Sequence, residues 1–398
     1  MKILYINELL NSSSGSSIHG RKLTEKLKLL DVSLLTIPAI NNEKSIKFRS
    51  NFIKTFMLNM PSAISEIIRF IKQNLKSFFS LLEIHFVIKS FKPDCILIRT
   101  ELYDLKPILL KKISKIPIVL EVNAPFFLEK KIHYEARNKN LIIPSFLSKL
   151  DLKIWKSADA IYVVSNILKK IVKSQLGNES PFIEVIPNGV DSDYLDKLPT
   201  EFSNGKSSDI RIGFAGSLQF WHGCELLLEA YEEIAKLRPA TKLIFIGDGE
   251  NRKNLEHYVY YNKNLKERVI FTGKLTYANT MEILKKMDIL VAPYKVSKYF
   301  YFSSLKIFDY MASGKAIIAS KLGQINEILE HDVDAILINP ENKEEFCNAL
   351  LTLIDSGEKR FKLGNMAFHK AKNYTWGKSA KSLLDLVQKI VTEKMYCA

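Results

Sequence analysis

Cysteine is scarce in this sequence, and the spacings typical of cysteine-based sites are missing. Four cysteines occur in 398 residues, none of them in a C-x-x-C pair, and the histidines form no cluster with them. This pattern favours neither a zinc site nor a disulfide framework, so we expect buried or unused thiols. The four are Cys95, Cys224, Cys347 and Cys397.

Long apolar runs are also absent. A membrane-spanning helix needs about 18 or more consecutive apolar residues, and no such stretch occurs. The apolar start, residues 1–6, is shorter than the core of a signal peptide, and no small-residue cleavage site follows it. We therefore expect a cytoplasmic chain, with any membrane contact peripheral on the inner face of the cell membrane.

Two nucleotide-binding fingerprints are missing as well. No G-x-G-x-x-G follows the first apolar run, and G-x-x-x-x-G-K-[ST] occurs nowhere. Gly247-Asp-Gly249 follows a predicted strand but lacks a third glycine, so a turn is the simpler interpretation. These absences argue against a dinucleotide-dependent dehydrogenase and a P-loop enzyme.

The charge that is present lies mostly in the first half. Of the formal net charge of +15, residues 1–190 contribute +13, from 29 Lys and Arg against 16 Asp and Glu. Such a basic field attracts nucleic acid, acidic lipid headgroups or a phosphorylated substrate. A lysine-rich surface with no specific partner explains the charge equally well, and we find no recognisable nucleic-acid module.

Short β-branched runs alternate with helical patterns along the chain. This alternation predicts an α/β protein with two doubly wound parallel-sheet domains, and the length fits two domains. Residues 186–191, with Pro-Asn-Gly, and the polar stretch 193–209 read as the linker. The expected strands are 3–7, 32–37, 95–99, 118–121, 160–164, 183–186, 210–215, 242–247, 269–272, 289–293, 316–320 and 335–338.

Residues 44–92 differ from the rest of the chain. They hold nine Lys and Arg against two Glu, together with eight phenylalanines. Residues 63–90 predict one or two helices with a broad apolar face. That face fits the interface of a membrane, but it also fits a domain helix that packs on a sheet with its lysines in water. Both interpretations remain open, and they can coexist.

Three loops after predicted strands are candidate anion sites, because backbone amides and a helix N-terminus bind phosphate. They are residues 11–17, 216–223 and 299–314. In the third, the serines can cap a helix that begins near Leu305 and leave N–H groups for a phosphate. Asp309, one turn further, can accept hydrogen bonds from a ribose diol.

Several of these segments resemble one enzyme family. Residues 303–319 (SSLKIFDYMASGKAIIA) resemble the donor-binding signature of family 4 retaining glycosyltransferases, which have the GT-B fold. Further matching segments are 214–217 with 222–223, 271–273, 187–191 and 323–327. The first half is similar more loosely, through the Gly15 loop and residues 119–125 and 163–165.

The resemblance implies two Rossmann-like domains facing a cleft. Residues 1–190 would bind the acceptor, residues 191–375 the nucleotide sugar, and residues 376–398 would pack back on the first domain. The resemblance also implies that the chain transfers a hexose with retention and without a metal or other cofactor. Stabilisation of the leaving group would be the main catalytic effect. The acceptor would be a glycan or lipid-linked, and residues 44–92 would contact an anionic membrane surface; nucleic acid is not an expected partner.

The chain departs from the family pattern at several site positions. The Glu-x7-Glu pair falls on Tyr301 and Asp309, and the basic pair that clamps the diphosphate falls on Ser217 and His222. Lys306 would supply the missing full charge, and Asn123 stands where a histidine often faces the sugar. The expected catalytic residues are thus Asn123, His222 and Lys306, and the donor-binding residues are Gly15, Gly216, Ser217, Gly247, Gly273, Tyr301, Ser303, Ser304, Leu305 and Asp309.

Other interpretations stay open. The departures also suit a catalytically inert subunit that binds a sugar nucleotide beside an active transferase, and a GT-B epimerase is a second enzyme class. His222 can also be interpreted as a helix-start residue, Lys306 as a surface lysine and Asn123 as a loop residue. Asp191-Ser-Asp193 resembles a metal-binding pair but lies in the linker, so we expect no metal there.

Overall fold

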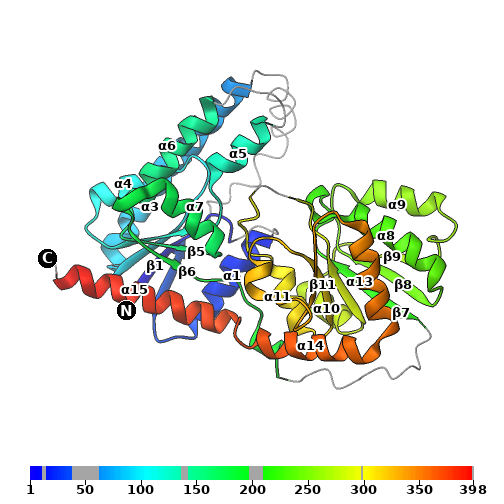
Figure 1. Cartoon of the computed structure of the whole chain (residues 1–398). Coiled ribbons are helices and arrows are strands. Elements are labelled where there is room, and N and C mark those ends of the chain that lie inside the picture. The colour runs from blue at the N-terminus through cyan, green and yellow to red at the C-terminus, as the bar shows by residue number, and fades with distance from the viewer. Residues whose placement is uncertain (11–14, 38–61, 136–141, 197–208, 297–298, 397–398) are drawn as a thin grey trace. The chain divides into compact units, whose positions relative to one another are not determined.

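The computed structural model describes residues 1–10, 15–37, 62–135, 142–196, 209–296 and 299–396. Contacts divide the chain into two compact units, shown in Figure 1. Unit 1 comprises Met1–Pro187 and Ser379–Ala398, and unit 2 comprises Asn188–Lys378. Most of the predicted linker, together with residues 44–61 of the basic segment, lies outside the described residues.

Unit 1 is built on a six-stranded parallel sheet with the order β2-β1-β3-β4-β5-β6. The chain moves outward from β1 in both directions, so β1 and β3 flank the point where the strand order reverses. Strands β3, β4 and β5 are wholly buried, as apolar runs covered by helices on both faces should be. The strands are β1 Lys2–Ile6, β2 Ser33–Ile37, β3 Cys95–Arg99, β4 Ile118–Val122, β5 Ala160–Val163 and β6 Phe182–Val185.

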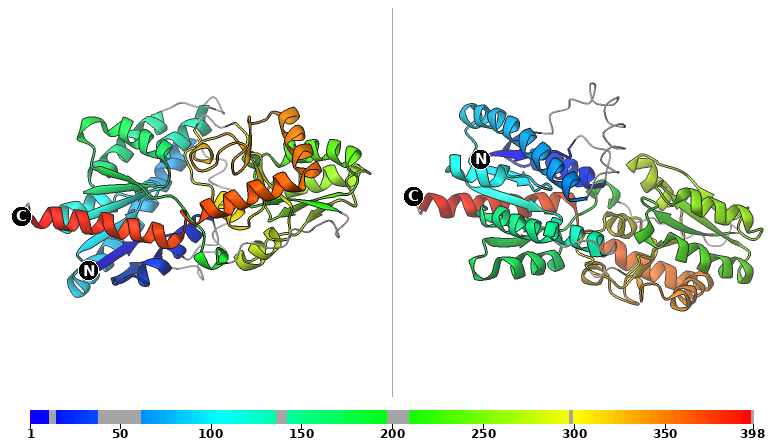
Figure 2. Two further views of the ribbon diagram at one scale, coloured as in Figure 1. Left: turned by 60° about the horizontal axis from the view of Figure 1, so that its bottom comes forward. Right: turned by 90° about the horizontal axis from the view of Figure 1, so that it is seen from above.

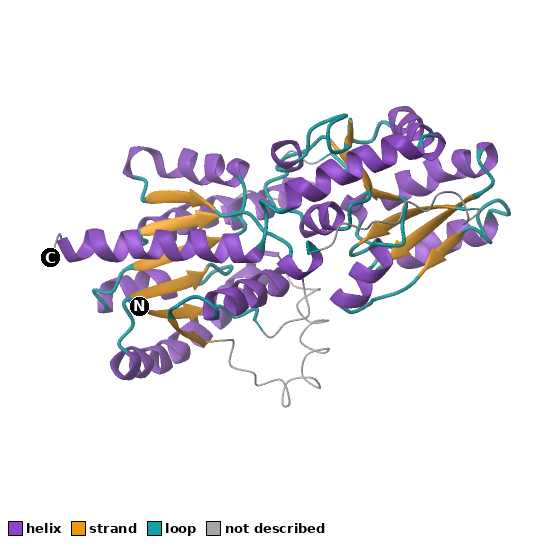
Figure 3. Cartoon of the chain, turned by 90° about the horizontal axis from the view of Figure 1, so that it is seen from below, coloured by secondary structure: helices purple, strands orange, loops and turns teal. Residues whose placement is uncertain are grey.

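Unit 2 repeats this plan with the order β12-β11-β10-β7-β8-β9, again all parallel. Here the reversal lies between β7 and β10. The predicted α/β class with two parallel sheets is confirmed, and Figure 3 shows helices flanking the strands of each unit. The strands are β7 Ile210–Ala215, β8 Thr241–Ile246, β9 Val269–Phe271, β10 Ile289–Ala292, β11 Ala316–Ser320 and β12 Ile336–Ile338.

Some of the helices begin at a side chain that caps them. Ser165, Thr276, Asn342 and Ser356 each accept a hydrogen bond from a backbone N–H in the first turn that follows. The helices of unit 1 are α1 Gly15–Lys28, α3 Ser62–Phe91, α4 Lys106–Ile113, α5 Phe126–Glu135, α6 Ile142–Lys156 and α7 Asn166–Leu176. Those of unit 2 are α8 Cys224–Leu237, α9 Arg252–Tyr261, α10 Tyr277–Leu284, α11 Leu305–Ala312, α12 Ile325–Ile328, α13 Lys343–Asp355 and α14 Gly357–Ala371.

The last helix, α15 (Trp376–Tyr396), starts in unit 2 and continues in unit 1. It is red in Figures 1 and 2. Its buried side chains Ala380, Leu383 and Val387 belong to the same core as Tyr5 and Leu97 of the unit 1 sheet. The apolar periodicity of this helix therefore supplies one face of the first unit's core.

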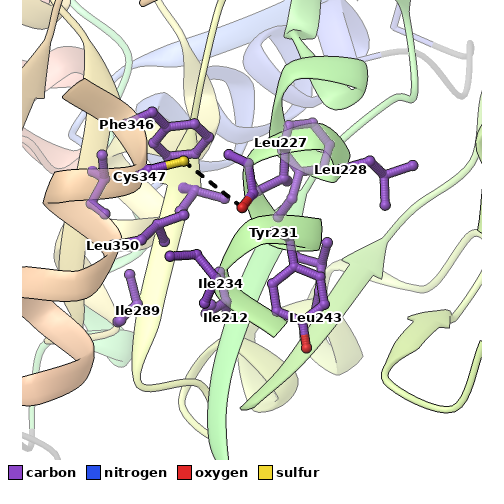
Figure 4. Close-up of a cluster of buried hydrophobic side chains, with 14 of the residues drawn as sticks. Ile212, Leu227, Leu228, Tyr231, Ile234, Leu243, Ile289, Phe346, Cys347 and Leu350 are labelled. Carbon is purple, nitrogen blue, oxygen red and sulfur yellow. Dashed lines mark hydrogen bonds between the residues drawn. The ribbon is translucent and has the colours of Figure 1, made fainter. Parts of the chain in front are cut away.

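The cysteines among the described residues are buried thiols, as expected. Cys95, Cys224 and Cys347 are free and buried, and Cys397 lies outside the described residues. Figure 4 shows Cys347 in the core of unit 2, where its thiol points to the carbonyl oxygen of Ala230. In the described part of the chain, no helix has both the length and the apolar character needed to cross a membrane.

Candidate functional site

The loops expected to bind the donor meet at the carboxyl ends of β7, β8 and β9. Gly216 and Gly247 have φ values of 137° and 139°, which side chains rarely allow. A Cβ atom on Gly247 would lie 2.0 Å from the carbonyl oxygen of Gly216, and Gly247 also bridges to Gly273. These glycines bring three strand ends together at the edge where doubly wound sheets bind ligands.

Lys306 lies against this loop. Its Nζ is 2.9 Å from where a Cβ of Gly216 would stand, and it sits over the ring of Phe214 at 3.9 Å from the centroid. The side chain is only 9% exposed, and within the described residues Nζ has no hydrogen-bond partner. Burial lowers the pKa of Lys306 from 10.5 to about 7. An ammonium that is buried without a hydrogen bond invites an anionic ligand.

His222 does not supply charge to this site. Its Nδ1 lies against the carbonyl oxygen of Ser217, so Nδ1 carries the proton and Nε2 is left as an acceptor. Burial, and then the charge of Lys306, lower its pKa to about 3. In the ligand-free chain the neutral ring therefore holds the Ser217 loop in place, and the expected contact of His222 with the diphosphate stays a prediction.

The N-terminus of α11 is not capped in the way the sequence suggested. Ser304 is the N-cap residue, but its hydroxyl bonds to the hydroxyl of Tyr294 at 2.6 Å instead of to the helix. The Ser303 hydroxyl is buried with no hydrogen-bond partner among the described residues, and its carbonyl accepts from the amide of Asn188 at 3.0 Å. The first N–H groups of α11, beginning at Leu305, therefore have no side-chain cap.

Asp309 lies one turn inside α11. The hydroxyl of Tyr277 donates to its Oδ1 at 2.7 Å, which leaves the other oxygen as an acceptor. The loss of water around this partly exposed carboxylate, followed by the nearby charge of Asp191, raises its pKa to about 7. Tyr301, which occupies the first position of the family's acidic pair, is buried.

In unit 1, Asn123 follows β4 and belongs to a buried polar network. Its amide donates to Oε1 of Glu121, which is fully buried and also lies 2.9 Å from Nη1 of Arg99. The hydroxyl of Tyr5 donates to Oε2 at 2.5 Å, and His19 lies 3.2 Å from Oε1. Burial alone would raise the pKa of Glu121, but Arg99 and His19 outweigh it and hold it well below its usual range.

Replacing this central carboxylate should destabilise the chain. In Glu121→Gln, the buried Arg99 guanidinium loses its counter-charge, so we expect a loss of about 3 kcal/mol. A thermal-unfolding scan should show the midpoint falling by roughly 6–12 °C. Glu83→Gln on the exposed side of α3 is the control. If both variants unfold at the same temperature, Glu121 does not anchor the network.

A second charged cluster lies at the reversal point of the unit 1 sheet, after β1 and β3. Lys106, 1% exposed, pairs with Glu8 and with Asp104 at 3.0 Å, and Lys76 of α3 pairs with Glu8 at 2.7 Å. Burial raises the pKa of the nearby Glu101 to about 7. Sequence reasoning did not single out any of these residues, because they are scattered and only the sheet order brings them together.

Other site residues were also missed. Tyr277 and Tyr294, which bind Asp309 and Ser304, stand in no motif. Asn188 was read as part of a turn, although its side chain ties that turn to the loop before α11. Gly15 begins α1, while residues 11–14 of its loop lie outside the described residues. The described part of the chain holds no cluster of three or more metal-binding side chains.

Comparison with known proteins places both units in one family. Residues 209–356 match the model for "Glycosyl transferases group 1", and residues 49–194 match that for "Glycosyltransferase Family 4". An uncharacterized glycosyltransferase of Methanocaldococcus jannaschii is 26% identical over 65% of this chain. This match covers 66% of the length of that relative. Two other glycosyltransferases from the same organism match this chain over 63% and 57% of their own lengths.

A further relative is the Escherichia coli UDP-Gal:alpha-D-GlcNAc-diphosphoundecaprenol alpha-1,3-galactosyltransferase, 23% identical over 71% of each chain. Among solved structures, sucrose-phosphate synthase from Thermosynechococcus elongatus has a TM-score of 0.75 and 16% identity over 99% of this chain and 100% of its own. Anabaena HepE in complex with UDP-glucose has a TM-score of 0.71 and 18% identity, and the match covers 98% of this chain and 100% of the HepE chain. With both family models, these likenesses establish that the chain belongs to the family 4 glycosyltransferases and has the GT-B fold.

Proposed function

We propose that this chain is a glycosyltransferase that moves a hexose from a nucleotide-diphosphate sugar to a glycan or lipid-linked acceptor, with retention and without a metal. The observation that carries the proposal is the buried Nζ of Lys306 beside Gly216, on the same helix as Asp309. This arrangement offers a cation and free helix amides for a diphosphate, and a carboxylate for a ribose three residues further along.

Leaving-group stabilisation would be the main catalytic effect. As the bond to the anomeric carbon breaks, negative charge develops on the diphosphate, and preorganised donors at that position lower the barrier. We assign this task to the amides at the start of α11, to the glycine loops at Gly216 and Gly247, and to Lys306. His222 would position the Ser217 loop.

Unit 1 would bind the acceptor. Asn123 donates one amide hydrogen to Glu121 and keeps a second hydrogen and its carbonyl oxygen for a sugar hydroxyl. A diphosphate-linked lipid is a reasonable acceptor to test first, because the E. coli relative bears that substrate in its name. The strong positive charge of residues 1–190 suits such an acceptor, and we expect residues 44–92 to face an anionic membrane surface.

A donor screen tests the proposal most directly. Thermal unfolding would be followed with a panel of nucleoside diphosphates and their sugars, starting from UDP and UDP-glucose, the ligand of the HepE neighbour. A ligand present at 100 times its Kd should stabilise the fold by about 2.7 kcal/mol. Release of nucleotide with acceptor extracts, with and without EDTA, would then establish transfer. Binding without turnover would favour the inert-subunit interpretation.

The affinity for the diphosphate should depend on pH through Lys306. In the free protein its pKa is about 7, and a bound diphosphate raises it, so binding takes up a proton. The contribution of Lys306 is therefore full well below that pKa and is lost above it, and the net affinity should fall by about tenfold between about pH 7 and about pH 8.5. Calorimetric titration with the diphosphate selected by the screen measures this change.

Lys306→Arg is the control for this pH dependence. Its guanidinium stays charged throughout the range, so the alkaline loss should disappear. In this variant only Asp309 still changes its charge, because its pKa is also about 7. Its deprotonation should raise the affinity for the diphosphate about twofold over the same pH interval. An equal alkaline loss in both proteins would show that another group binds the diphosphate.

A further inference from the structure

Helix α3 turns its polar face toward its own unit. Ser77, 1% exposed, donates to Asp104 at 2.9 Å, and Asn74 donates to the carbonyl oxygen of Tyr103 at 2.9 Å. Near the start of the helix, Glu66 accepts from the Tyr103 hydroxyl at 2.5 Å and from Lys130 at 2.6 Å. This side of α3 is therefore attached by hydrogen bonds and ion pairs, together with the buried Ile84 and the contact of Phe70 with Tyr103.

The opposite side of α3 is apolar and exposed. Its apolar residues recur at intervals of three and four, so they form one continuous stripe along the helix. The exposed fraction of their side chains rises to 62% at Phe79 and 70% at Phe86. The stripe, which we call the α3 outer face, consists of Ile64, Ile67, Ile68, Ile71, Leu75, Phe78, Phe79, Leu82 and Phe86.

The long apolar stripe of α3 thus faces away from unit 1, whereas an ordinary surface helix packs its apolar stripe on the core. A contiguous apolar surface of this kind marks an interaction site, because leaving it in water costs free energy in proportion to its area. In the right view of Figure 2, α3 is the light-blue helix along the margin of unit 1. The outer face thus needs an occupant other than the core of its own unit.

The positive charge around the α3 outer face indicates what binds to it. Lys72 and Lys89 are exposed on α3, and Arg69 has half of its side chain in water beside its partner Glu66. Residues 1–190 together carry a net charge of +13. An apolar stripe accompanied by cations matches the boundary of an anionic bilayer, which offers acyl chains and acidic headgroups together.

We propose that the α3 outer face inserts into the surface of an anionic membrane, with α3 parallel to the bilayer plane and its polar side still bonded to unit 1. A bilayer receives only the exposed stripe, so none of the hydrogen bonds of the inner side needs to break. This inference deepens the acceptor side of the proposed function, since it brings the chain to a surface where lipid-linked acceptors reside. Its test does not require any transfer activity.

The experiment is co-sedimentation of the full chain with vesicles of phosphatidylcholine, with and without phosphatidylglycerol. We expect binding to the anionic vesicles, weaker binding to the neutral ones, and a decrease at high salt. Phe78→Gln/Phe79→Gln removes two large side chains of the outer face and should weaken binding more than about tenfold. Lys72→Gln/Lys89→Gln should weaken only the anionic component.

The matched control is Leu29→Gln/Ile113→Gln, which removes two exposed apolar side chains of unit 1 that lie outside α3. It should bind vesicles as the parent does. Ligand-induced thermal shifts on all variants check the donor site separately, so failure of the membrane proposal is distinguishable from failure of the proposed function. Equal binding by the Phe78/Phe79 variant and the control would overturn the proposal. A dimer in vesicle-free solution that this variant abolishes, without vesicle binding by the parent, would also overturn it.

Discussion

Replacing Lys306 with methionine should make the protein more stable and nearly inactive. Methionine fills the same space beside Phe214 without an ammonium, so the cost of burying a cation without hydrogen bonds disappears. We expect a gain of about 1–3 kcal/mol in the ligand-free protein. The same change removes the only charged donor that we assign to the leaving diphosphate, so transfer should fall about 100- to 1,000-fold.

The stability gain has a pH signature. Because folding lowers the pKa of Lys306 from 10.5 to about 7, its ammonium penalises the folded state fully below pH 7 and less as pH rises toward 10.5. The advantage of Lys306→Met should therefore be largest at and below neutral pH and vanish in alkali. Urea unfolding at several pH values measures it, with the exposed Lys253→Met as control. A variant that is destabilised, or that keeps full activity, would refute this role.

Replacing Asp309 with alanine should weaken donor binding about 100-fold, because two charge-assisted hydrogen bonds to the ribose are lost. Tyr301→Phe, at the other position of the family's acidic pair, should change affinity less than about threefold. Calorimetry with the nucleoside diphosphate chosen by the screen gives both values. Equal affinities of the Ala variant and the parent would remove Asp309 from the donor site.

A 2′-deoxyribose ligand distinguishes a direct contact from a general disturbance of the site. The parent should bind the deoxy diphosphate about tenfold more weakly than the ribose form, whereas Asp309→Ala should bind the two alike. Tyr277→Phe removes the hydrogen bond to Oδ1 but keeps the carboxylate, so it should still discriminate. If Asp309→Ala also discriminates between them, its carboxylate acts on the fold of the loop and does not read the ribose.

The strands could be predicted because their signal is local. Segments such as 95–99 and 316–320 are short, apolar and bounded by polar residues, and a strand buried on both faces requires that pattern. The helix that we expected near Leu305 begins there. The segment that resembles the family signature thus coincides with a strand-to-helix connection at the reversal point of a sheet.

Site chemistry could be predicted only in part, because hydrogen-bond partners and burial depend on distant segments. Ser304 stands where a helix-capping serine is expected, yet the hydroxyl of Tyr294 draws its side chain away from the helix. His222 was expected to carry charge, but packing beside Phe214 and Lys306 removes water from the ring. Glu121 lies in a segment that resembles the family, but its role in a buried network could not be predicted, because its partners come from β1, α1 and β3.

By itself the sequence determined the α/β class, two sheets, the family signature and the presence of an amphipathic helix near residues 63–90. It left open which way that helix faces, because periodicity defines a stripe and not its direction. The tertiary structure decided this, since the polar side of α3 finds partners in Asp104, Tyr103 and Lys130 that no local pattern could announce. It likewise decided that Lys306 is buried without a hydrogen bond to any residue that the structure describes, because burial is a property of the neighbours that the fold assembles.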